Sequence, residues 1–143
     1  MVAFLGDSPM FHYRRKEGTL KKVTQDHTVA GALERGGLIT PEMARVHEGR
    51  SRLEFYVGCQ QLPKELPIET LILETGDILL LCSDGISGSL EHEEIKEIIA
   101  SNGDNLEVTA QQLIDSSLAA EETDNQTLIL WSHPENFVSN ISG

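Results

Sequence analysis

The chain has 143 residues, 39% of them apolar and 24% charged, which is typical of one folded globular domain. Its formal charge of −12, from 23 acidic and 11 basic residues, argues against nucleic acid as a partner, because binding a phosphate backbone requires clustered lysine and arginine. No apolar stretch approaches ~20 residues, so we expect no membrane span. The acidic excess either keeps the surface solvated or gathers carboxylates around a divalent ion, and composition alone favours the former.

The two cysteines, Cys59 and Cys82, form no C-x-x-C pair. Cys82 lies in an apolar run, which predicts a small residue of the core. We therefore expect no disulfide framework, and this absence suits a reducing cytoplasm.

The first half of the chain predicts a hairpin followed by two capped helices. Residues 2–5, 10–14 and 19–24 have the apolar content of strands, and a Lys-Glu-Gly turn joins the last two. Thr28 is a predicted cap for a helix that ends near Gly36. Thr40 and Pro41 begin a second helix that should run to about His47. Residues 53–57 then predict a strand, and residues 58–67 a loop.

The second half centres on residues 78–82, an apolar run that reads as a strand buried on both faces. The alternating residues 68–73 should pair with it through a turn at 74–77. Residues 93–100 and 108–120 predict amphipathic helices, the second with Leu113, Ile114 and Leu118 facing inward. Residues 127–131 form a last strand. Hairpins and paired helices predict an α+β fold with mostly antiparallel sheet.

Three aspartates lie at the ends of predicted strands. Asp7 follows the first strand, Asp84 follows the central strand and Asp124 shortly precedes the last. Three carboxylates in such positions can converge on a hard cation such as Mg²⁺ or Mn²⁺, which takes oxygen ligands. Aspartate is also common in turns, so spacing alone leaves both interpretations open.

Other reactive constellations are weaker. Ser83 and Ser87 near His92 lack the G-x-S-x-G pattern of a nucleophile elbow. The five histidines are not spaced as zinc ligands. A carboxylate could orient His27, since Asp26 precedes it, although a structural hydrogen bond is the more common role. Neither cysteine has a basic neighbour that would lower the pKa of its thiol.

Four short motifs resemble, in order and approximate spacing, the metal-dependent protein phosphatases of the PP2C (PPM) type, especially the bacterial members. The resemblance spans residues 2–131, nearly the whole chain. The motifs are Gly6-Asp7-Ser8, Thr24-Gln25-Asp26-His27, Gly76-Asp77 leading into Leu79-Leu80-Leu81-Cys82-Ser83-Asp84-Gly85, and Asp124-Asn125-Gln126-Thr127.

The resemblance implies a PP2C-like sandwich of two antiparallel β-sheets flanked by helices, with a dinuclear Mg²⁺ or Mn²⁺ site. It implies that Asp84 and Asp124 are metal ligands and that Asp7 lies near a third, weaker position. Asp26 corresponds to a structural residue, and the segment from Thr28 to Arg50 to a flap that contacts substrate. The implied reaction is hydrolysis of phosphoserine or phosphothreonine in a phosphoprotein by metal-bound hydroxide, without a covalent intermediate.

The sequence departs from the family in several places. The upstream D-G-x-x-G motif with its bridging aspartate is missing, Pro9 stands where arginine is usual, and Tyr56-Val57-Gly58 replaces A-L-G. Two readings follow. Residues 1–132 are the C-terminal portion of a truncated phosphatase domain with little or no activity alone, followed by a polar tail, 133–143. Alternatively, they form a non-catalytic binding or regulatory module. Truncation would expose sheet edges and apolar faces, which predicts self-association.

Overall fold

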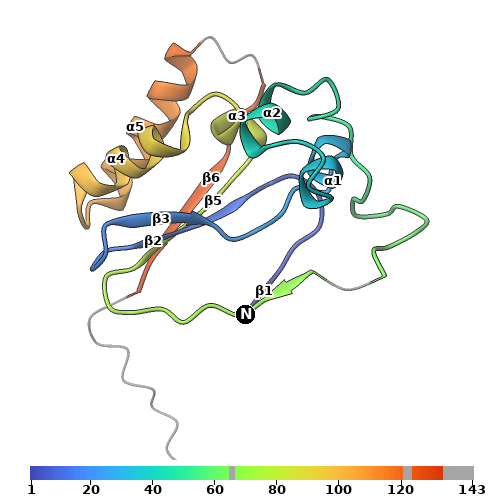
Figure 1. Ribbon diagram of the computed structural model, residues 1–143. Helices are drawn as coiled ribbons and strands as arrows, with labels where there is room; N and C mark the ends of the chain where they lie inside the picture. The colour runs from blue at the N-terminus through green and yellow to red at the C-terminus, as the bar shows by residue number, and fades with distance from the viewer. Residues whose placement is uncertain (65–66, 121–123, 134–143) are drawn as a thin grey trace, which may run out of the picture.

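A four-stranded antiparallel sheet organises the computed structural model, which describes residues 1–64, 67–120 and 124–133 (Figure 1). The strand order is β3-β2-β5-β6, and β1 and β4 form a separate two-stranded sheet. Helices α4 and α5 lie together along one side of the larger sheet. The elements are β1 Val2–Ala3, β2 Met10–Arg14, β3 Thr19–Lys22, α1 Val29–Arg35, α2 Pro41–Val46, β4 Ile68–Glu69, β5 Ile78–Cys82, α3 Asp84–Ser87, α4 His92–Asn102, α5 Leu106–Ala119 and β6 Leu128–Ser132.

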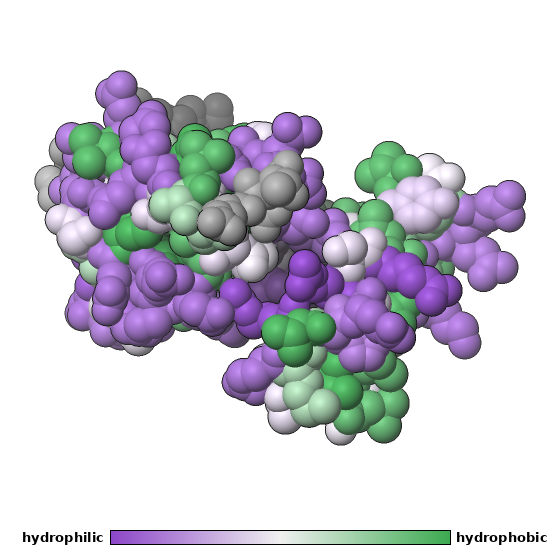
Figure 2. Space-filling view, turned by 90° about the horizontal axis from the view of Figure 1, so that it is seen from above, coloured by the Kyte–Doolittle hydropathy of each residue, from purple (hydrophilic) through white to green (hydrophobic). Residues whose placement is uncertain are grey.

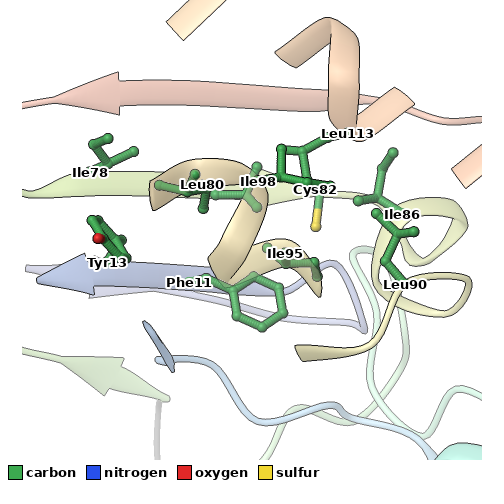
Figure 3. Packing of buried hydrophobic residues seen from close by; sticks show 11 residues of the cluster. Phe11, Tyr13, Ile78, Leu80, Cys82, Ile86, Leu90, Ile95, Ile98 and Leu113 are labelled. Atoms are coloured by element: carbon green, nitrogen blue, oxygen red, sulfur yellow. The ribbon is translucent and has the colours of Figure 1, made fainter. Parts of the chain in front are cut away.

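The core lies between this sheet and the helices α3, α4 and α5 (Figure 3). Alternate residues of β5 enter it, because successive side chains of a strand point to opposite faces. Ile78 and Leu80 have no exposed surface, and Leu113 of α5 is equally buried against them. The rest of the buried cluster consists of Phe11, Tyr13, Cys82, Ile86, Leu90, Ile95, Ile98 and Ile99. Cys82 is therefore the core residue that its apolar surroundings predicted.

The other face of β5 and β6 remains open. Leu79 pairs with Trp131 and Leu81 with Ile129 across the two strands. Ile129 is 63% exposed, and Leu81 and Trp131 are each 41% exposed. We call these four residues the open face. An apolar stripe of this kind on a sheet marks a surface that another layer covers.

A buried hydrogen bond between two side chains links the two central strands. His12 of β2 and Asp77, which precedes β5, are 5% and 1% exposed, and their Nε2 and Oδ2 atoms are 2.8 Å apart. Asp77 also accepts hydrogen bonds from the backbone N–H groups of Glu74 and Arg15, at 3.0 and 3.2 Å. Burial by itself would raise the pKa of Asp77, but these hydrogen bonds outweigh it and hold the pKa below its usual value.

The structure confirms the antiparallel α+β class, the β2–β3 hairpin and both helix caps. Thr28 accepts a hydrogen bond from Gly31 N–H, and Thr40 from Met43 N–H. None of the helices among the described residues is long and apolar enough to cross a membrane.

Several predictions were wrong. Residues 53–57 form no strand and make only a single bridge, between Leu53 and Thr28. Residues 68–73 do not pair with β5; only Ile68–Glu69 is a strand, and it pairs with β1, while β5 lies between β2 and β6. Helix α3 was not predicted, and Leu118 is 55% exposed rather than buried. Most of the predicted tail, 134–143, lies outside the described residues.

Candidate functional site

Asp84 stands at the end of the central strand, as the sequence predicted. β5 ends at Cys82, Ser83 takes extended backbone geometry, and the short helix α3 begins at Asp84. The side chain is exposed although Gly85 and Ile86 behind it are buried. A carboxylate in this position is rigidly placed but open to solvent, which is what a ligand for an exchangeable ion requires.

Ser83 joins the turn that carries Asp124 to the end of β5. Its hydroxyl donates to the carbonyl of Asn125 at 3.0 Å and accepts from the N–H of Thr127 at 3.1 Å. Its own N–H donates to the carbonyl of Thr127 at 2.9 Å. Gly85 permits this approach, since a Cβ at that position would lie 2.7 Å from the carbonyl oxygen of Asn125. Asp84 and Asp124 are thus held on adjoining turns.

Asp7 reaches the same region from the turn after β1, and His27 fixes that turn. The N–H of Gly6 donates to Nδ1 of His27 at 3.1 Å, and the N–H of His27 donates to the carbonyl of Gly6 at 2.9 Å. The imidazole is buried between the rings of Phe4 and Phe55. Burial and the nearby Arg35 lower its pKa, so the ring is a neutral acceptor at physiological pH.

Asp26 does not orient His27, although it precedes it in the sequence. The carboxylate of Asp26 instead pairs with Lys22, with 2.7 Å between the charged atoms. His27 therefore forms a structural hydrogen bond, which was the more common of the two alternatives that the sequence left open.

Asp7, Asp84 and Asp124 all line one cavity of about 780 Å³. Figure 2 shows it as a hollow with polar side chains around it, between the two lobes of the molecule. Burial raises the pKa of Asp7, and the negative charges of Asp84 and Asp26 raise it further. The cavity therefore has a negative potential that a cation would relieve.

The oxygen atoms of these carboxylates are suitable ligands for a hard divalent ion, but too few of them lie close together to hold one. Oxygen donors are the ligands that Mg²⁺ and Mn²⁺ prefer. Among residues 1–64, 67–120 and 124–133, however, no three His, Cys, Asp or Glu side chains lie close enough together to hold a metal ion. The described part of the chain carries a partial set of donors, which needs further ligands to become a metal centre.

The segment from Thr28 to Arg50, which we call the flap segment, forms the wall opposite the aspartates. Glu34 of α1 and Glu42 and Arg45 of α2 line the cavity. The caps predicted both helices, and the resemblance implied that this segment contacts substrate. No local pattern showed which of its residues would line the cavity, because this depends on the tertiary path of the segment.

The alternative nucleophiles are not assembled. Nε2 of His92 is 3.1 Å from the carbonyl of Leu20, and the hydroxyl of Ser83 is engaged with Asn125. Burial raises the pKa of the Cys82 thiol to about 12, so this sulfur is not a thiolate at neutral pH.

No family model matches the chain, but individual proteins do. It is 33% identical to the protein phosphatase PhpP of Streptococcus pneumoniae over 102 residues, covering 71% of this chain and 40% of that protein. The structure of the PPM Ser-Thr phosphatase MsPP from Mycobacterium smegmatis superposes with a TM-score of 0.73 at 30% identity, over 88% of this chain and 52% of that one. The catalytic domain of PstP, solved with two manganese ions, superposes with a TM-score of 0.72 at 29% identity, over 90% and 50%.

The chain thus spans about half the length of the relatives it matches. The match lies in their C-terminal part.

Proposed function

We propose that this chain, which is similar in sequence and fold to the C-terminal half of the PP2C-type (PPM) serine/threonine phosphatases, is the corresponding half of a metal-dependent protein phosphatase. The substrate is a phosphoprotein carrying phosphoserine or phosphothreonine. The observation that carries the proposal is that Asp7, Asp84 and Asp124 line one cavity, where Ser83 joins the turn of Asp124 to the end of β5 beside Asp84.

In this proposal Asp84 and Asp124 are ligands of Mg²⁺ or Mn²⁺, and Asp7 belongs to a third, weaker position. The donors that this chain lacks come from the other half of such a domain. Divalent ions in such sites polarise phosphoryl oxygens and activate water. The free cysteines Cys59 and Cys82 suit a cytoplasmic protein.

The open face supports the same proposal. Its four apolar residues are placed to pack against a second sheet, of which β1 and β4 supply only two short strands. We propose that the other half of the domain covers this face. When the isolated chain is kept in water, the same face and the free strand edges favour self-association.

The test is phosphatase activity with and without the other half. The isolated chain should show little or no Mn²⁺-dependent hydrolysis of p-nitrophenyl phosphate or of a phosphothreonine peptide. A chimera in which this chain replaces the matched half of the pneumococcal phosphatase should hydrolyse both, and Asp84→Asn should abolish turnover. Turnover by a folded chimera that survives Asp84→Asn would contradict the proposal.

The partial donor set favours a second candidate, a non-catalytic binding or regulatory module of the same fold. The chimera separates the two. A folded chimera that binds a phosphothreonine peptide but does not hydrolyse it with Mn²⁺ would support the module.

A further inference from the structure

The flap segment is firmly fixed at its base. The N–H of Val29 donates to the carbonyl of Arg52 at 2.9 Å, and the N–H of Ala30 donates to that of Gly49 at 3.2 Å. The bridge between Thr28 and Leu53 closes the segment. These bonds hold the two ends of the flap segment together and leave the position of α2 to be set by other contacts.

Helix α2 is largely surrounded by solvent. It has only six residues, of which Pro41, Glu42, Met43 and Val46 are exposed. Ala44 is buried and, with Arg45, lines the cavity. A helix this short has little stability of its own, so its position depends on the contacts that it makes.

Arg45 connects α2 to the opposite wall of the cavity. One Nη atom donates to the carbonyl of Leu90 at 3.1 Å and lies 3.3 Å from a carboxylate oxygen of Glu91. Leu90 is a core residue, and Glu91 caps α4, so both acceptors belong to the rigid part of the molecule. The guanidinium group suits this place because its several N–H groups serve two acceptors at once.

We propose that Arg45 is a positioning residue that latches the flap segment over the aspartate cavity and so sets access for substrate. This role rests on the proposed function, since it makes the cavity a substrate site. The latch is reversible, because its charged partners are 36% and 71% exposed and such pairs are weak and screened by salt. Loss of the contact should raise the open population by up to about fivefold.

The experiment measures exposure of the cavity wall under α2. Ala44→Cys places a thiol on that wall, in a chain whose other reactive cysteine is removed by Cys59→Ser. The rate of modification by a small thiol reagent then reports how often the flap segment opens. Buried Cys82, with its pKa of about 12, gives little background.

Arg45→Ala should raise the modification rate about two- to fivefold, and Arg45→Lys should restore part of the protection because it keeps the charge facing Glu91. Added NaCl should raise the rate when Arg45 is present and leave it unchanged in Arg45→Ala. The matched control is Arg14→Ala, which removes an arginine with 40% exposure and ion pairs of 3.3 and 3.4 Å, and neither Arg14 nor its partners line the cavity. It should leave the rate unchanged.

An unchanged rate in Arg45→Ala, or an equal rise in Arg14→Ala, would overturn the latch. If Ala44→Cys prevents folding, cleavage at the exposed Glu42 and Glu48 by a glutamate-specific protease provides the same comparison. Thiol modification requires no catalysis. An inactive chimera with a salt-sensitive latch would therefore count against the proposed function and not against the role of Arg45.

Discussion

Replacing Asp77 by alanine should be among the most damaging single changes in this chain. The carboxylate is 1% exposed and accepts three hydrogen bonds, from His12 and from the N–H groups of Glu74 and Arg15. Alanine leaves all three donors without their acceptor inside the fold. Each buried donor that loses its partner costs about 1–3 kcal/mol, so the loss of all three should cost at least about 3 kcal/mol. A domain has only about 5–15 kcal/mol of stability in total.

The assay is urea unfolding followed by circular dichroism. With a slope of about 1–3 kcal/mol per molar, the expected loss moves the midpoint by more than about 1 M. Asp104→Ala is the matched control, because Asp104 pairs with Arg15 at 2.5 Å but is 82% exposed. That surface pair should contribute at most about 1 kcal/mol. If both variants shift the midpoint equally, the reasoning from burial is refuted.

The same carboxylate gives a pH dependence of defined sign. Its pKa is lower in the folded than in the unfolded state, so the folded state binds fewer protons there. Its contribution is complete above the unfolded pKa of about 4 and is lost as the pH falls through the lower folded value. The Asp77→Ala protein should lack this part of the acid unfolding profile.

Three further predictions concern the site and the open face. Gly85→Ala should destabilise the fold by about 1–3 kcal/mol, because the added Cβ would lie 2.7 Å from the carbonyl oxygen of Asn125. Thermal unfolding measures this loss, and an unchanged Tm would contradict the close approach. The pKa of His27 is lower in the folded than in the unfolded chain, so the unfolded chain binds more protons at this site below pH ~6.5. The free energy of unfolding should therefore fall as the pH drops from there toward the folded pKa. In urea titrations, His27→Phe should flatten this pH dependence. Light scattering at tens of micromolar should show that the isolated chain is larger than a monomer, and burial of the open face should blue-shift the emission of its single tryptophan, Trp131. Ile129→Lys should reverse both effects. A monomer with unshifted emission would argue against self-association through the open face.

Local chemistry made part of the fold predictable. The threonine caps at Thr28 and Thr40 and the apolar content of residues 10–14 are short-range signals, and the two helices and strand β2 appear where they were expected. The position of Asp84 at the end of β5 was predictable, because a buried run ending in Ser-Asp-Gly fixes it, and its role as a metal ligand stays a prediction. Asp7 and Asp124 were expected beside it from their motifs. All three line the same cavity, but among the described residues no three such side chains lie close enough together to hold a metal ion.

The remainder depended on distant partners. Residues 68–73 alternate as a strand should, yet β5 pairs with β2 and β6, because pairing is decided by which strands bury the most apolar surface together. The cavity wall formed by Glu34, Glu42 and Arg45 carries no motif. It exists because the flap segment folds back across the end of the sheet, and no local pattern encodes that return.

The buried pair of His12 and Asp77 joins positions 65 residues apart, and the flap segment lies entirely within the loop that this contact closes. Forming the central sheet therefore requires a long-range encounter, which predicts slow folding relative to helical chains of this size. The cost of closing a loop grows only with the logarithm of its length. Residues can thus be inserted or removed in the flap at little cost to the sheet, so the wall of the cavity can diversify while the aspartates opposite it stay in place.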